Sequence, residues 1–160
     1  MSVLGELQPN KVFKYFEEIC SIPHGSRNLQ QISDYLVDFA KAHELKYRQD
    51  EDLNVIIWKD GSKGYEASEP VILQGHMDMV AVKEADCDKD MEKEGLDLEI
   101  NGDYISAKGT SLGGDDGIAV AYTLAVLDDE EMAHPPIEAI FTVNEEIGML
   151  GAATIDCFRS

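Results

Sequence analysis

Two short apolar runs, each ending at ionisable side chains, constrain the fold of this chain most strongly. Residues 71–74 (VILQ) lie between Pro70 and Gly75, and residues 137–143 follow Pro135-Pro136. Short β-prone runs bounded by proline or glycine predict strands, and these two have the composition of strands buried within a sheet, the first on both of its faces. Strands of this kind need covering helices, so the other segments of the chain are expected to include helices.

Helical patterns alternate with these strands. Apolar residues recur at three- and four-residue spacing within Pro9–Pro23 and again from about Asn28 to His43, which predicts two amphipathic helices. A third helix is expected over 118–127, where Asp115 or Asp116 could cap free backbone N–H groups. The alternation predicts an α/β layered domain with a sheet that is covered on both faces.

Shorter elements complete the expected fold. Residues 46–49 and 54–58 are predicted to form short strands, and residues 96–107 to form a hairpin that turns at Asn101-Gly102, because this dipeptide accepts the positive φ angles of a tight turn. Residues 150–158 have the pattern of another covering helix. The chain would therefore form one domain.

Composition excludes several classes of function. The 160 residues carry 13 Lys+Arg against 32 Asp+Glu, a formal net charge of −19, which disfavours nucleic-acid binding. The uncharged run 117–127 has about half of the ~20 residues that a membrane span needs, and residues 1–11 lack the pattern of a secretory signal. Cys20, Cys87 and Cys157 are too far apart for a disulfide framework or a cysteine zinc site. We expect a cytoplasmic protein with reduced thiols.

Three groups of ionisable side chains fall where an α/β sheet presents its functional edge. These groups are His76 with Asp78, Asp115 with Asp116, and Glu145 with Glu146. Residues two apart in an extended segment point to the same side, so His76 and Asp78 could face one site. An imidazole and several carboxylates form the mixed ligand set of a catalytic zinc, manganese or cobalt site.

Each group alone also has an ordinary structural explanation. A single His-x-Asp sequence is a weak signal, the paired aspartates could cap a helix, and the paired glutamates could be a solvated strand end. Together, however, three acid-bearing segments at one sheet edge would repel one another unless they were protonated or bridged by cations. This coincidence favours a metal site.

The segments that carry these groups resemble a known family, the zinc-dependent exopeptidases with a two-metal site, and within it the bacterial aminoacyl-histidine dipeptidases, also called cytosol non-specific dipeptidases. The resemblance rests on residues 20–24 (CSIPH), 73–80 (LQGHMDMV), 108–117 (KGTSLGGDDG) and 145–149 (EEIGM). One departure is Asp116, where these dipeptidases often have Asn. The resemblance implies a three-layer αβα sheet domain that is incomplete at its carboxyl end.

The resemblance also implies roles for individual residues. His76 would bind one of two divalent ions, Asp115 would bridge both ions, and Glu146 would bind the second. Zinc is the expected metal, with manganese or cobalt as alternatives. Asp78 would orient His76. Glu145 would be the general base that takes a proton from a water bridging the metals and passes it to the leaving amine.

This family has further parts that the sequence does not supply. They are an Asp soon after the Glu-Glu pair, a distant His, and a lid or dimerisation domain. Residues 1–160 are therefore interpreted as the amino-terminal portion of a metallopeptidase catalytic domain. The complete protein would bind a small peptide as its substrate and hydrolyse dipeptides of the Xaa-His type. It would form a homodimer through the missing domain. The isolated chain would be inactive. The alternatives are an N-acyl amino acid deacylase and a non-catalytic metal-binding fragment.

Overall fold

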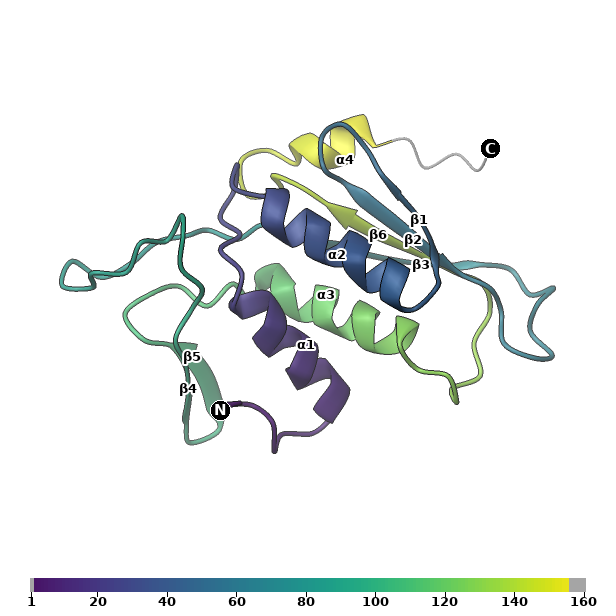
Figure 1. Cartoon of the computed structure of the whole chain (residues 1–160), viewed down its shortest axis with the longest axis horizontal. Coiled ribbons are helices and arrows are strands. Elements are labelled where there is room, and N and C mark those ends of the chain that lie inside the picture. Colours follow the sequence, from purple (N-terminus) through teal and green to yellow (C-terminus); the bar gives the residue numbers. More distant parts are fainter. Residues whose placement is uncertain (1, 156–160) are drawn as a thin grey trace.

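The computed structural model describes residues 2–155 and shows one sheet, a separate hairpin and four helices (Figure 1). The helices are α1 (Asn10–Cys20), α2 (Gln30–Ala42), α3 (Gly114–Leu127) and α4 (Leu150–Thr154). The strands are β1 (Lys46–Gln49), β2 (Val55–Lys59), β3 (Val71–His76), β4 (Leu98–Asn101), β5 (Tyr104–Ala107) and β6 (Ile137–Thr142). The expected helices and strands are therefore present, with ends that differ by at most four residues. Residues 156–158 of the expected last helix lie outside the described residues.

The main sheet is mixed, with strand order β1-β2-β6-β3. β1 pairs with β2 and β2 with β6 in antiparallel register, whereas β3 and β6 are parallel, from Val71 opposite Ile137 to His76 opposite Thr142. The carboxyl ends of parallel neighbours meet at one edge of a sheet. The segments that follow β3 and β6 therefore emerge side by side.

Helices α2 and α3 pack against this sheet, and α1 packs against α3. Figure 1 shows α2 over β1 and β2, with α3 along β3 and α1 below α3. The apolar residues of the strands and helices meet in one core, whose fully buried members include Leu36, Ile57, Leu124, Ala139 and Phe141. This arrangement confirms the α/β fold class. Within residues 2–155, no helix has both the length and the apolar character that a bilayer crossing requires.

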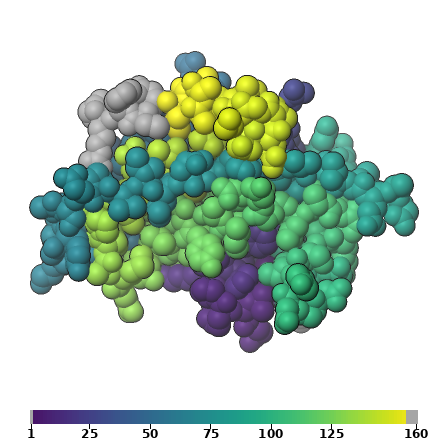
Figure 2. Space-filling model, turned by 180° about the vertical axis from the view of Figure 1, so that it is seen from behind, coloured from purple at the N-terminus to yellow at the C-terminus, as the bar shows by residue number. Residues whose placement is uncertain are grey.

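The prediction that β3 is buried on both faces is wrong. Val71 is 44% exposed and Ile72 is 58% exposed, because β3 has a partner strand on one side only in the described sheet. Figure 2 views the molecule from behind, where α4 lies along the top and the chain that includes β3 runs exposed across the middle. Apolar composition alone did not reveal this edge position.

The predicted hairpin is confirmed, but its turn lies one residue further along the chain. Asn101 pairs with Tyr104, so Gly102 and Asp103 form the turn, and Gly102 has the positive φ of 62° that a tight turn requires. Asn101 is the last paired residue of β4. The hairpin projects from the lower side of the molecule, away from the main sheet (Figure 1).

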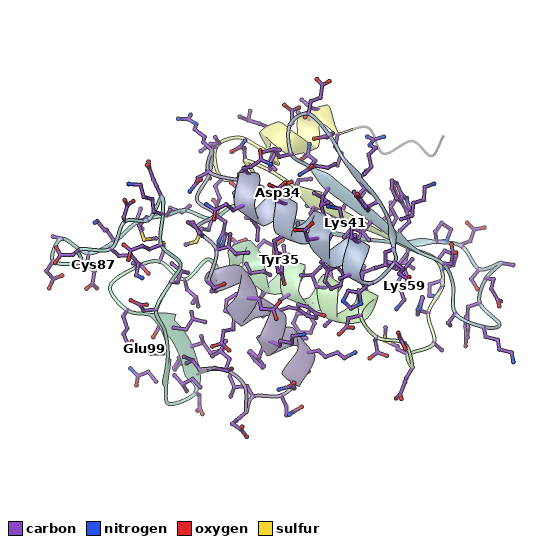
Figure 3. All side chains as sticks on the ribbon, viewed as in Figure 1. Asp34, Tyr35, Lys41, Lys59, Cys87 and Glu99 are labelled. Atoms are coloured by element: carbon purple, nitrogen blue, oxygen red, sulfur yellow. The ribbon has the colours of Figure 1, made fainter. Side chains whose placement is uncertain are left out.

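Polar side chains join elements of the fold at two places. Lys59, at the end of β2, donates to the carbonyl oxygens of Val126 at 3.1 Å and Asp129 at 2.5 Å, beside the carboxyl end of α3, where a cation complements the helix dipole (Figure 3). Tyr35 of α2 donates its hydroxyl to Glu18 of α1 at 2.7 Å. The first bonds join the sheet to the end of α3, and the second joins two helices.

Replacing the central aromatic residue of the core tests this packing. Phe141 on β6 is fully buried, so Phe141→Ala is expected to lower the free energy of unfolding by about 3–5 kcal/mol through the lost burial and the cavity it leaves. Urea unfolding followed by circular dichroism measures the loss. The control Tyr104→Ala, at a residue that is 78% exposed, should change stability by less than about 0.5 kcal/mol. Equal losses in the two variants would contradict the assigned core.

Candidate metal centre

Three segments that are distant in sequence meet at the carboxyl edge of β3 and β6. One ligand atom from each of His76, Asp115 and Glu146 lies within 4.8 Å of the other two. His76 Nε2 is 3.2 Å from Asp115 Oδ1 and 3.8 Å from Glu145 Oε2. The structure therefore brings together the three residues that the sequence analysis assigned to metals, with Glu145 beside them.

Gly75 allows α3 to lie close to β3 at this point. A Cβ atom on Gly75 would lie 3.1 Å from Asp116 Oδ2 and 3.4 Å from the Cβ of Ala119. The missing side chain lets the start of α3 approach the strand, which places Asp115 beside His76. A single glycine thus helps to set the distance between two of the three segments.

The two aspartates at the start of α3 do not cap the helix. Asp115 (φ −90°, ψ 109°) and Asp116 (φ −115°, ψ 24°) have non-helical backbone angles, and no side chain accepts a capping bond at this end. The capping interpretation is therefore wrong. Asp116 Oδ2 instead accepts the backbone N–H of His76 at 3.3 Å, and the side chain of Asp115 is 89% exposed beside the imidazole.

The imidazole of His76 has a fixed orientation. Its Nδ1 donates to the backbone carbonyl of Asp78 at 2.9 Å and lies 3.5 Å from the Asp78 carboxylate. In the neutral ring, Nε2 then carries the lone pair, and this atom faces the acids. Burial favours the neutral ring, but the carbonyl and carboxylate of Asp78, followed by Asp115, outweigh it and raise the pKa of His76 above 6.5.

Asp78, which follows β3, connects the end of that strand to the segment that follows β6. Asp78 is 1% exposed, and its carboxylate accepts the backbone N–H of Glu145 at 3.0 Å and that of Glu146 at 3.3 Å. The hydroxyl of Ser26 donates to the same carboxylate at 2.7 Å. The sequence analysis assigned Asp78 to His76 alone and missed Ser26, since a lone serine carries no pattern that signals such a contact.

The site concentrates negative charge without a compensating side-chain cation. Burial first, and then the charges of Asp115 and Glu145, raise the pKa of Asp116 above its usual 3.8. Among residues 2–155, no lysine or arginine forms an ion pair with Asp115, Glu145 or Glu146. A neutral imidazole nitrogen and unpaired carboxylates are the donors that divalent metals such as zinc bind, so the residues present fit a metal ion.

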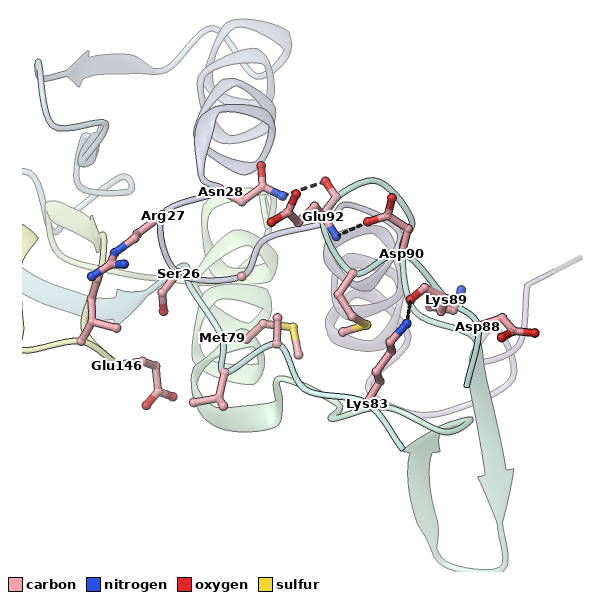
Figure 4. A pocket seen from close by; sticks show the side chains of 15 residues that line it. Ser26, Arg27, Asn28, Met79, Lys83, Asp88, Lys89, Asp90, Glu92 and Glu146 are labelled. Carbon is pink, nitrogen blue, oxygen red and sulfur yellow. Dashed lines mark hydrogen bonds between the residues drawn. The ribbon is translucent and has the colours of Figure 1, made fainter. Parts of the chain in front are cut away.

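A cleft of about 890 Å³ opens beside Glu146 (Figure 4). Val80 and Ile147 give it apolar surface. Its charged lining is mixed, with three basic residues (Arg27, Lys83 and Lys89) and four acidic ones (Asp88, Asp90, Glu92 and Glu146). Its volume lies in the range of about 300–1,000 Å³ that is usual for small-molecule sites. The candidate metal centre therefore has room beside it for a small ligand.

Two other histidines, His24 and His134, have structural surroundings. His24 Nδ1 contacts the carbonyl of Ile22 at 2.6 Å, and burial lowers the pKa of this imidazole. His134 Nδ1 contacts the carbonyl of Pro135 at 2.8 Å. Neither histidine belongs to the group of possible metal ligands found among the described residues.

Comparisons with known proteins agree with this geometry. No protein-family model matches the chain. The chain is 41% identical over 152 residues to the cytosol non-specific dipeptidase of Escherichia coli (strain K12), a match that covers 95% of this chain and 31% of that protein. The structure matches that of an aminoacylhistidine dipeptidase from Vibrio alginolyticus with a TM-score of 0.93 and 39% identity, covering 96% of this chain and 31% of that one. A Staphylococcus aureus tripeptidase structure, with a TM-score of 0.75 and 24% identity, shares the fold. The chain thus spans about a third of the length of its dipeptidase relatives.

Filling the space at Gly75 tests how the site is assembled. Gly75→Val would push its side chain into Asp116 and Ala119, so we expect a loss of about 1–3 kcal/mol in the free energy of unfolding from overpacking. Chemical denaturation measures it. Gln74→Val, which places the same side chain on the exposed face of β3, is the control and should cost less than about 0.5 kcal/mol. A tolerated valine at position 75 would show that close approach of α3 is not required.

Proposed function

Because this chain is related over nearly its whole length to the aminoacyl-histidine, or cytosol non-specific, dipeptidases, we propose that it is the amino-terminal portion of the catalytic domain of a metal-dependent dipeptidase. The relatives are hydrolases of peptide bonds. The observation that carries the proposal is the convergence of ligand atoms from His76, Asp115 and Glu146 within 4.8 Å. The proposed substrates are dipeptides of the Xaa-His type, and the proposed location is the cytoplasm.

We assign two divalent ions to the three converging side chains and propose that both ions are zinc. His76 Nε2 would hold one ion, Glu146 the other, and the exposed carboxylate of Asp115 would lie between them. The absence of an ion pair from lysine or arginine to these acids within residues 2–155 supports the assignment, since like charges so close together need a cation. Bound metal ions would supply Lewis-acid polarisation of the scissile carbonyl and would acidify water.

Glu145 is the proposed proton carrier. Its Oε2 lies 3.8 Å from His76 Nε2, next to the ligand group but outside the three converging ligands, and its side chain is 39% exposed to the solvent from which a water would come. A carboxylate in this place can accept a proton from the attacking water and return it to the leaving amine. Asp78 holds His76 and the Glu145-Glu146 backbone in place for this proton transfer through its hydrogen bonds.

The rest of the machinery is proposed to lie outside these 160 residues. Since the chain spans about a third of its relatives, the remaining metal ligands, the lid that grips substrate and a dimer interface would come from further sequence. The isolated chain is therefore proposed to be inactive. The cleft beside Glu146 would receive one end of the dipeptide, and its lining offers apolar surface together with side chains of both charges.

Metal titration of the 160-residue chain tests the site directly. Calorimetry should show zinc or manganese binding to the wild type and at least about tenfold weaker binding to His76→Ala and Asp115→Asn, because each loses a ligand. Protons compete for His76, so affinity should fall as the pH drops below its raised pKa. A saturating metal should also raise the melting temperature.

The control for this titration is Asp103→Asn, the same substitution in the exposed hairpin turn, which should bind metal as the wild type does. No metal-dependent heat in the wild type would defeat the site assignment. Equal binding in Asp115→Asn and in the wild type would remove Asp115 from the ligand set.

The role of Glu145 is tested in the complete protein. Glu145→Gln removes a proton acceptor and keeps the shape of the side chain, so turnover of Xaa-His dipeptides should fall by about 10²–10⁴-fold while the metal content stays the same. Dipeptide hydrolysis and metal analysis measure the two quantities. Glu130→Gln, on an exposed loop, is the matched control and should retain activity. Full turnover in Glu145→Gln would contradict the proposed role.

A further inference from the structure

The connection between α1 and α2 contacts both loops that carry the candidate site. The backbone N–H of Ser26 donates to the carbonyl of Met79 at 3.2 Å, and Met79 N–H donates to the carbonyl of His24 at 3.1 Å, which attaches the connection to the segment after β3. The backbone N–H of Arg27 donates to Asn144 Oδ1 at 2.8 Å, which attaches it to the segment after β6. Figure 4 shows Ser26, Arg27, Met79 and Glu146 around one cleft.

The side chain of Ser26 extends this connection to Asp78. The Ser26 hydroxyl donates to Asp78 Oδ2 at 2.7 Å, the shortest of the bonds to this carboxylate, while the amide of Glu146 reaches the same oxygen at 3.3 Å. The carboxylate is buried and has no ion pair with lysine or arginine within the described chain, so hydrogen-bond donors must stabilise its charge. Without Ser26, Oδ2 would retain only the longer bond.

We propose that Ser26 is a positioning residue that acts through Asp78 to hold the Glu145-Glu146 backbone against the end of β3. The hydroxyl fixes the rotation of the Asp78 carboxylate, and the carboxylate fixes the two amides that follow β6. The part of this inference that concerns metal affinity rests on the proposed function. The part that concerns the two amides does not.

Loss of the hydroxyl should act selectively on one side of the site. The hydrogen bond of His76 goes to the backbone carbonyl of Asp78 and does not depend on how the carboxylate is turned, while the carboxylate lies further off, with Oδ1 3.5 Å from His76 Nδ1. Glu145 and Glu146 instead contact the carboxylate itself. A displacement of about 1 Å in such groups is enough to reduce catalysis about 10²-fold, so small rotations of Asp78 matter.

Arg27 and Asn144 strengthen the case that this connection is built for position. Both have left-handed backbone angles, with φ of 72° for Arg27 and 54° for Asn144, and the two residues are hydrogen-bonded to each other. Residues other than glycine rarely adopt this conformation, and surrounding contacts must hold it. The strained pair lies directly beside Ser26 and Glu145 in the sequence.

Amide hydrogen exchange of the metal-free chain tests the positioning role without any activity. In Ser26→Ala, the amides of Glu145 and Glu146 should exchange at least about tenfold faster than in the wild type, because their acceptor becomes mobile. Ser26→Thr keeps the hydroxyl and should restore protection. Ser106→Ala, which removes another serine-carboxylate bond, to Glu99 in the hairpin, is the control and should leave both amides unchanged. Unchanged exchange in Ser26→Ala overturns the proposal.

Metal affinity supplies a second readout that a merely structural role would not move. Zinc or manganese should bind Ser26→Ala about 10–100-fold more weakly than the wild type, and Ser26→Thr should bind as the wild type does. A lower melting temperature of Ser26→Ala with unchanged metal affinity and unchanged exchange would overturn the positioning role. If the wild type binds no metal, the proposed function fails, and hydrogen exchange still decides the role of Ser26.

Discussion

The parallel pairing of β3 with β6 is the constraint on which the rest of this structure depends. It places His76 opposite Thr142, so the chain that leaves β3 and the chain that leaves β6 begin their loops at the same height. Ionisable residues that are about seventy positions apart thereby become neighbours. The central position of β6, between β2 and β3, makes this pairing part of the packed core, and the geometry of the site therefore inherits the rigidity of the sheet.

Acidic groups can be collected at such an edge only if their charges are balanced, and the chain uses two different solutions. Asp78 is buried, and backbone N–H groups with one hydroxyl surround it. Asp115 stays exposed at the edge, where its carboxylate faces the imidazole of His76. The first solution needs no ion and holds the backbone in place. The second keeps the carboxylate at the solvent-accessible edge, where the proposed divalent cations could reach it.

The sequence predicted most of the elements, and it singled out His76, Asp115 and Glu146, which the structure brings together, because both rest on local patterns. The helical spacing near α1 and the residues that carry the family resemblance lie within short windows. Properties that depend on the assembled fold were missed. The exposure of Ile72 follows from the edge position of β3, and the contacts of Asp115 and Asp116 with His76, in place of helix caps, follow from the approach of α3 to Gly75. Ser26 lies 52 positions from Asp78, and no short pattern joins them.

The distribution of donors around Asp78 explains why one side chain has an unusually large influence on the loop after β6. Two of its partners are backbone N–H groups, which every residue other than proline supplies, so substitutions at those positions leave the donors in place. The third is the hydroxyl of Ser26, which a side chain alone provides. The orientation of the Asp78 carboxylate therefore depends on the side chain of Ser26, a residue outside the Glu-Glu segment. A site of this construction would be ordered before the proposed ions arrive, so less of the binding free energy would be spent on ordering its ligands.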